Sequence, residues 1–308
     1  MGGSRAQAYL QLFRLPNIFT AVADVMMGFL FTHPTLQPAG LFFLLFAASC
    51  LLYTAGMVLN DVFDVEVDRQ ERPSRPIPSG RVSLFVARWL GFELLILGAA
   101  LGWLASFFAG DLRAGIVASA LALCVLAYDA GLKRTPLGPV AMGGCRFLNV
   151  LLGMSLAVDP LLGTPLPWQT AHWLVAAGIG VYIVGVTWFA RREAVTSGRW
   201  QLALATLVLL AGIALLAWLP NWDRRIIVPI SRWFVFWGLI AVLIAWRCVR
   251  AVITPSPGNV QAAVKHCILS LILLDAVVVF AVRGSFWAVM VLLLTIPAML
   301  IGRWIYST

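Results

Sequence analysis

Long apolar segments separated by short polar ones are the feature that most restricts how this chain can fold. Of its 308 residues, 61% are hydrophobic and 11% are charged, whereas soluble domains carry about 25% charged residues. One soluble core cannot bury this much apolar sequence, and several segments reach the ~20 residues that a helix needs to cross a bilayer. The sequence therefore predicts an all-α, multi-pass integral membrane protein with a single domain over residues 1–308.

Polar residues divide this domain into ten expected membrane spans. Only Arg283 and Gly284 stand between the last two, so these two could also form one longer element. The ten expected spans lie near residues 8–32, 39–63, 84–107, 112–131, 137–158, 170–190, 201–219, 229–251, 262–282 and 286–305.

Basic residues are concentrated in every second loop, which the positive-inside rule places in the cytoplasm. Both termini and these loops are then expected on the cytoplasmic side of an inner or plasma membrane. We attribute the net charge of +9 to such loops and to anionic headgroups of the lipid bilayer, rather than to nucleic acid. The loops after even-numbered spans carry Arg69, Arg72, Arg75 and Arg81, then Lys133 and Arg134, then Arg191, Arg192 and Arg199, then Arg247, Arg250 and Lys265.

The stretch NDVFDVEVDRQERPSRPIPSGRVS, at the end of the second span, holds an unusual share of the negative charge. Five of the chain's 13 acidic residues lie between positions 61 and 71. If the span continues as a helix, four polar side chains fall within an arc of about 100°. Pro73 disfavours helix at Arg72, so the helix is expected to end there. The polar face consists of Asn60, Asp61, Asp64 and Asp68, with Tyr53 about two turns deeper.

Such a face of carboxylates suits Mg²⁺, which binds oxygen ligands, keeps some waters and is completed by substrate phosphates. Three carboxylates on one face repel one another and are costly near a bilayer without compensation. The alternative is a solvated helix end whose acids pair with Arg69, Arg72 and Arg75. We favour the metal interpretation because the carboxylates are in phase and the arginines follow them.

The second cytoplasmic loop and the fifth span carry further polar candidates. Lys133 and Arg134 would lie at the membrane surface, where they can bind phosphate oxygens. Arg146 falls inside the fifth span and is expected to face a polar cavity, with Asn149 on the same side of the helix. Asp24 and Asp275 are also expected within the membrane, each as a cavity group or as a partner for a neighbouring helix.

The acidic stretch carries a family resemblance. NDVFDVEVDRQERPSRPIPSG resembles the first aspartate-rich motif, NDxxDxxxD followed by RPxPxG, of the UbiA superfamily of membrane prenyltransferases. FRLPN, which ends at Asn17, resembles the RPxN element of these chains, and Tyr128 with Lys133 resembles their YxxxK element with one extra residue. Within the superfamily, the segment from Tyr128 onward looks most like the EboC-type branch.

The resemblance implies nine core transmembrane helices around a central cavity, here with a tenth C-terminal helix. It implies an Mg²⁺-dependent enzyme that ionises an isoprenyl diphosphate and alkylates a small-molecule acceptor, which the sequence does not identify. Asp61, Asp64 and Asp68 would be the catalytic acids and, with Asn60, the metal ligands. The expected substrate-binding residues are Asn17, Tyr53, Asn60, Arg72, Arg75, Tyr128, Lys133, Arg134, Arg146, Asn149, Arg191, Arg192 and Glu193, of which Tyr53 would stabilise the allylic cation through its ring face.

The chain departs from the family pattern in the loop after the sixth span. The family has a second acidic motif there, whereas this loop reads VTWFARREAVTSGRW, with Glu193 as its only acid beside Arg191 and Arg192. Guanidinium groups could replace a second metal by binding diphosphate directly, or the protein could bind a lipid phosphate without ionising it. A terpene cyclase on the same scaffold, or a non-catalytic transport or lipid-binding protein, are the remaining alternatives.

Overall fold

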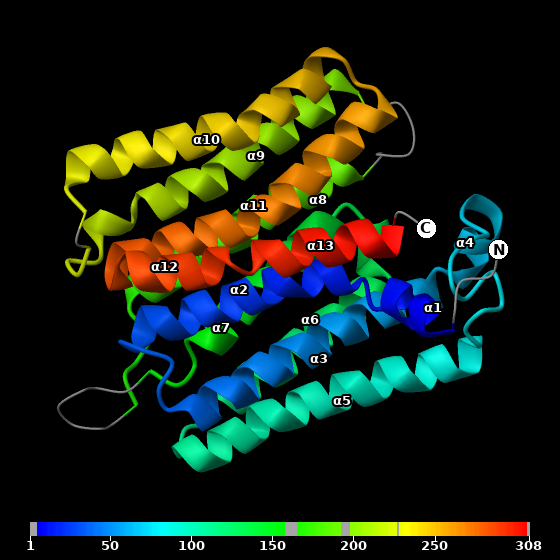
Figure 1. Ribbon diagram of the computed structural model, residues 1–308, viewed down its shortest axis with the longest axis horizontal. Coiled ribbons are helices and arrows are strands. Elements are labelled where there is room, and N and C mark those ends of the chain that lie inside the picture. Colours follow the sequence, from blue (N-terminus) through cyan, green and yellow to red (C-terminus); the bar gives the residue numbers. More distant parts are fainter. Residues whose placement is uncertain (1–4, 158–164, 192–197, 227, 307–308) are drawn as a thin grey trace.

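The computed structural model describes residues 5–157, 165–191, 198–226 and 228–306, and every long element in these ranges is a helix. Most of the helices run along the long axis of a single bundle (Figure 1). Their bounds are α1 (Arg5–Leu12), α2 (Leu15–Thr32), α3 (Ala39–Phe63), α4 (Val65–Glu71), α5 (Leu84–Ala109), α6 (Arg113–Ala130), η1 (Leu132–Arg134), α7 (Gly138–Gly153), α8 (Thr170–Ala190), α9 (Arg199–Ala217), η2 (Leu219–Asn221), α10 (Ile230–Ile253), α11 (Pro257–Arg283), α12 (Ser285–Leu292) and α13 (Thr295–Tyr306).

The described helices confirm the predicted fold class. Nine of the described segments are long and apolar enough to cross a membrane, and the last of these joins α12 and α13. Helix α7 has 16 residues, which is shorter than the ~20 of a full span. It nevertheless packs inside the bundle against α2, α6 and α8, so each of the ten predicted spans has a counterpart.

Two predicted spans are broken. The first divides at Arg14, whose φ of 45° is left-handed, because Pro16 has no amide hydrogen with which to continue the helix from α1. The last divides between Leu292 and Thr295. The two C-terminal spans are separate helices, because Gly284, with a φ of 83°, lets the chain reverse between α11 and α12.

Helices α2 and α7 cross at glycines. A Cβ atom on Gly153 would lie 2.4 Å from the Val25 carbonyl oxygen, and one on Gly28 would lie 2.6 Å from the Val150 carbonyl oxygen. Small residues let membrane helices approach until their backbones touch. This crossing brings the polar side chains of α7 against those of α2.

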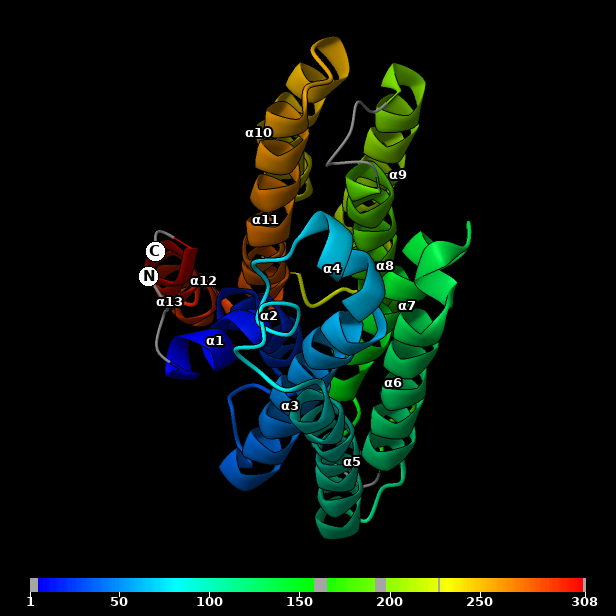
Figure 2. The same ribbon diagram turned by 90° about the vertical axis from the view of Figure 1, so that its right-hand side faces the viewer.

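The aspartate-rich segment lies at one end of the bundle, which we call the motif end and define by α4. The described N- and C-terminal helices, α1 and α13, have their outer ends there as well (Figure 1). Figure 2 looks onto the motif end, with α4 in front of the bundle. The outer ends of α1 and α13 therefore lie at the same end of the bundle as the motif, and which side of the membrane this is stays a prediction.

Candidate active site

The helix of the second span does not continue unbroken through the acidic stretch. Helix α3 ends at Phe63, Asp64 adopts φ −97° and ψ 5°, and α4 then runs to Glu71. Arg134 donates a hydrogen bond of 3.1 Å to the Phe63 carbonyl oxygen. A side chain that takes a carbonyl out of the helical hydrogen-bond ladder is a common cause of such a break. The predicted end of the helix near Arg72 is confirmed.

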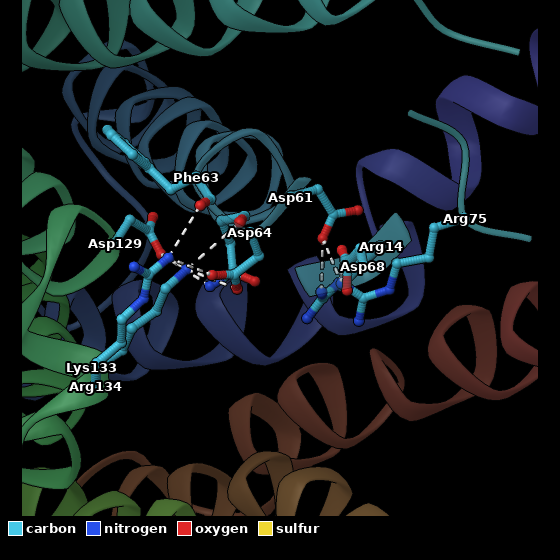
Figure 3. A network of polar contacts seen from close by, with 10 residues as sticks. Arg14, Asp61, Phe63, Asp64, Asp68, Arg75, Asp129, Lys133 and Arg134 are labelled. Atoms are coloured by element: carbon cyan, nitrogen blue, oxygen red, sulfur yellow. Dashed lines mark hydrogen bonds and ion pairs between the residues drawn. The ribbon is translucent and has the colours of Figure 1, made fainter. Parts of the chain in front are cut away.

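The break divides the predicted carboxylate face into two ion clusters, which Figure 3 shows side by side. In the first, Arg75 Nη1 lies 2.6 Å from Asp68 Oδ2 and 3.1 Å from Asp61 Oδ1. Arg14 Nη2 approaches Asp61 Oδ1 to 3.0 Å. Asp61 and Asp68 are buried, so the two guanidinium groups supply the compensation that their charges require.

The second cluster joins α3 to the loop after α6. Lys133 Nζ lies 2.8 Å from Asp64 Oδ2 and 3.8 Å from Asp129 Oδ1. Arg134 Nη2 lies 3.4 Å from Asp64 Oδ1. Asn60 Nδ2 donates to Asp129 Oδ1 at 2.9 Å. Lys133 and Arg134 thus contact Asp64 of the aspartate motif, and their binding of phosphate stays a prediction.

A cavity of about 180 Å³ extends from these clusters into the bundle. Its walls come from α2, α3, α6 and α7, with Arg14 at the start of α2. It combines aromatic, apolar and polar groups, and five of the predicted substrate-binding residues line it. The lining residues are Arg14, Ala21, Leu52, Tyr53, Gly56, Met57, Asn60, Leu121, Val125, Tyr128, Asp129, Met142, Cys145, Arg146 and Asn149.

The inner end of the cavity is a polar network between α2 and α7. Arg146 Nη1 lies 2.8 Å from Asp24 Oδ2, and its Nη2 donates to Thr20 Oγ1 at 2.7 Å. Asn149 Nδ2 donates to Asp24 Oδ2 at 3.1 Å. The Arg146 Cζ atom also lies 5.3 Å from the ring centroid of Tyr53. Arg146 and Asn149 therefore face the same polar cavity, as their spacing predicted.

The two intramembrane aspartates both interact with Arg146 and with each other. Asp24 on α2 forms an ion pair with Arg146 on the neighbouring helix α7. Asp275 on α11 is fully buried and interacts electrostatically with Asp24 and Arg146 rather than with a cation of its own. Asp275 does not line the cavity.

Other predicted site residues lie outside the two clusters and the cavity. Asn17 lines a different hollow, between α2, α11 and α13. Arg72 is exposed and has no side-chain partner among the described residues. Arg191, at the end of α8, donates to the Thr135 carbonyl oxygen and so joins the loop after α8 to the one after α6. Arg192 and Glu193 lie outside the described residues.

Two site residues were missed by the sequence analysis. Arg14 belongs to the FRLPN element, which predicts a role for Asn17 alone, and it binds Asp61. Asp129 lies between Tyr128 and Lys133, and its spacing of four residues from Lys133 is the signal that would have identified it.

The donor atoms of the site suit magnesium. Within the described residues, no three His, Cys, Asp or Glu side chains lie close enough together to hold a metal ion alone. Mg²⁺ usually takes one or two carboxylates and completes its coordination with waters and substrate phosphates. The oxygens of Asp61, Asp64 and Asp68 therefore suit an ion that binds together with a phosphorylated substrate.

Comparison with known proteins agrees with this architecture. Residues 21–262 match the model of the UbiA prenyltransferase family. The digeranylgeranylglyceryl phosphate synthase of Saccharolobus solfataricus is 35% identical over 130 residues, which are 42% of this chain. The match covers 44% of that relative, or somewhat less than half of its length.

Two solved structures share the fold. One is a digeranylgeranylglyceryl phosphate synthase studied for structural and mechanistic insights into biosynthesis in membranes. Its sequence is 21% identical to this chain, and the TM-score is 0.65. The match covers 91% of this chain and 99% of that one. The other is a UbiA homologue from Archaeoglobus fulgidus bound to DMAPP and Mg²⁺, 16% identical with a TM-score of 0.54, over 88% of this chain and 98% of that one. The narrower assignment to the EboC-type branch stays a prediction.

Proposed function

Since the chain belongs to the UbiA prenyltransferase family, we propose that it transfers an isoprenyl group from an isoprenyl diphosphate to a glycerol phosphate lipid. The name of its relative from Saccharolobus solfataricus describes a glyceryl phosphate with two geranylgeranyl groups. The corresponding acceptor carries one such group and a free hydroxyl. In the reaction, the allylic C–O bond breaks, diphosphate leaves with the electron pair, and the acceptor oxygen forms the new C–O bond and loses its proton.

The observation that carries this proposal is the set of cations at the mouth of the cavity. Lys133, Arg134, Arg14 and Arg75 each bind an aspartate of the motif. Diphosphate oxygens are acceptors of the same kind as carboxylate oxygens, so a bound diphosphate can share these cations. The cations would stabilise the charge that develops on the leaving group.

Asp61, Asp64 and Asp68 would hold magnesium on the diphosphate. The ion, when bound, stabilises negative charge on phosphoryl oxygens as a Lewis acid. The chain's own part is to keep the three carboxylates oriented, and Arg75 does this by binding Asp61 and Asp68 together. Lys133 orients Asp64 from the other side.

The cavity would receive the isoprenyl chain and limit the attack of water on its reacting carbon. Leu52, Leu121, Val125 and Met142 supply apolar surface that keeps water from the reacting carbon. Tyr53 and Tyr128 line the same cavity, and their rings can stabilise a cation.

Asp129 is the only carboxylate among the described residues that line this cavity. Because the acceptor hydroxyl must lose a proton, we assign the role of base to Asp129. Asn60 holds one of its oxygens, Oδ1, by a hydrogen bond of 2.9 Å and so fixes the orientation of the carboxylate.

We place the motif end at the cytoplasmic face. The basic residues of the even-numbered loops support this orientation. It lets a water-soluble diphosphate headgroup reach Lys133 and Arg134 while the isoprenyl chain stays in the bilayer. A reporter fused at the C-terminus would be accessible only from the cytoplasm, and access from the other side would contradict the orientation.

The test uses purified protein in detergent with labelled geranylgeranyl diphosphate, geranylgeranylglyceryl phosphate and Mg²⁺. We expect a lipid with two geranylgeranyl groups and an equal amount of diphosphate, and neither product in EDTA. A cyclic hydrocarbon formed without acceptor would indicate a terpene cyclase instead.

A second candidate function is binding of a lipid phosphate without ionisation. It is favoured by the loop after α8, where the family's second acidic motif is replaced by ARRE with Glu193 as the only acid. Saturable binding of geranylgeranyl diphosphate, with no diphosphate released in the presence of acceptor and Mg²⁺, would support this function over transfer.

A further inference from the structure

A second hollow of about 510 Å³ lies at the motif end, between α2, α11 and α13. Helix α2 packs against both α11 and α13, and Figures 1 and 2 show the three helices side by side. We call this hollow the α13 groove. It is lined by Pro16, Asn17, Gln261, Val264, Lys265, Ile268, Leu269, Ala298, Met299, Gly302 and Arg303.

The α13 groove has a polar, cationic outer part. Lys265 and Arg303 face it from α11 and α13, with Gln261 one helical turn before Lys265. No carboxylate is among its lining residues, and neither cation forms an ion pair within the described ranges. Two unneutralised positive charges beside amide groups favour a ligand with a phosphate.

The inner part of the α13 groove is apolar. On α11, Ile268 and Leu269 lie about one turn deeper than Lys265, and on α13, Met299 lies about one turn deeper than Arg303. The order of residues along both helices therefore runs from cationic to apolar, away from the motif end. This order matches a molecule with an anionic head and a hydrocarbon tail.

The α13 groove is separate from the candidate active site. The two cavities share no lining residue. The family match ends at residue 262, whereas α13 and most of the groove's residues on α11 follow it. Of the residues that line the groove, all but Gln261 therefore lie outside the matched range.

We propose that the α13 groove binds an anionic phospholipid of the bilayer, which the reaction does not consume. The phosphate would lie between Lys265 and Arg303, and an acyl chain would follow Ile268 and Met299. Basic pockets between membrane helices on the cytoplasmic side bind anionic lipid headgroups. Long basic side chains also extend to the interface without a ligand, but this tendency does not create an apolar hollow beside them.

The proposal is tested by native mass spectrometry of the delipidated protein with phosphatidylglycerol or phosphatidylcholine of identical acyl chains. We expect one tightly bound phosphatidylglycerol, preferred over phosphatidylcholine on the order of tenfold, because two basic groups contact the headgroup. The double variant Lys265→Ala/Arg303→Ala should lose this preference while its melting temperature in detergent without lipid stays within a few degrees of the wild-type value.

The matched control is Arg247→Ala/Arg250→Ala, which removes two exposed basic residues near the end of α10. It lowers the net charge by the same amount and should keep the preference. Equal binding of the two lipids to the wild type, or an equal loss in both double variants, would overturn the proposal. Displacement of phosphatidylglycerol by geranylgeranyl diphosphate would also overturn it, because the groove would then be a substrate site.

Discussion

Arg146 and Asp24 form a buried ion pair across the crossing of α7 and α2, with 2.8 Å between Nη1 and Oδ2. Thr20 accepts a hydrogen bond from Arg146, and Asn149 donates one to Asp24 Oδ2. A guanidinium inside a membrane span is costly unless it is paired. The pair therefore orders the inner end of the cavity and joins two of the helices that line it.

Removal of one partner should destabilise the protein strongly. Asp24→Leu leaves the Arg146 charge buried without its partner, and breaking a buried pair costs about 3–5 kcal/mol. We expect a clearly lower melting temperature for the protein in detergent. The double variant Asp24→Leu/Arg146→Met should recover much of the loss, because both charges are then absent. A single variant as stable as the wild type would contradict the importance of the pair.

Asp64 should be required for catalysis, whereas a nearby acid should not. We expect Asp64→Ala to lower Mg²⁺-dependent release of diphosphate by about 100-fold or more, because the variant loses a proposed metal ligand and the partner of Lys133. Glu66→Ala is the matched control: Glu66 is exposed, and its side chain binds only Arg69 among the described residues. Wild-type rates in Asp64→Ala, or an equal loss in both variants, would rule out the metal assignment.

The sequence predicts much of this fold because its signals are local. A run of apolar residues between charged ones is sufficient to locate a membrane helix. The helical repeat likewise places Asn60 and Asp61 at the end of α3, but the single face that it predicts through Asp64 and Asp68 is divided by the break at Asp64. The break at Arg14 also has a local cause, because Pro16 follows it. It is not predicted because the apolar sequence on both sides resembles one continuous span.

The detailed site could not be predicted because its contacts join distant parts of the chain. Arg14 and Asp61 are 47 residues apart, and Asn60 and Asp129 are 69 apart. The break at Asp64 involves Arg134, which is 71 residues from Phe63. Spacing within one helix cannot indicate such partners. The FRLPN element predicts that Asn17 contacts the diphosphate, and its place at the α13 groove likewise depends on packing against α11 and α13.

Substitution of Asp129 should separate transfer from ionisation. Asp129→Asn keeps the size of the side chain and an oxygen that can accept from Asn60, but it cannot take the acceptor's proton. We expect formation of the two-chain lipid to fall about 100-fold, as is usual for loss of a general base, while diphosphate release falls less and the prenyl alcohol accumulates.

The readout for Asp129 compares labelled lipid, prenyl alcohol and diphosphate in one reaction. Asp129→Glu retains the carboxylate and should restore part of the transfer. Equal losses of transfer and diphosphate release in Asp129→Asn, with no recovery in Asp129→Glu, would show that Asp129 has only a structural role.

The close crossing of α2 and α7 should not tolerate a side chain at Gly153. A Cβ atom there would lie 2.4 Å from the Val25 carbonyl oxygen, which belongs to backbone and cannot move aside as a flexible side chain can. We expect Gly153→Ala to destabilise the protein by about 1–3 kcal/mol, the usual cost of overpacking. Because the crossing positions Arg146 against Asp24, transfer activity should also fall.

Gly238→Ala is the matched control for Gly153→Ala. It adds the same methyl group to α10, where no atom lies within 4 Å of the new Cβ. It should therefore leave the melting temperature unchanged or raise it slightly. Thermal unfolding of the two variants in the same detergent checks this, and equal stability would show that the crossing is not as tight as the distance between Gly153 and Val25 requires.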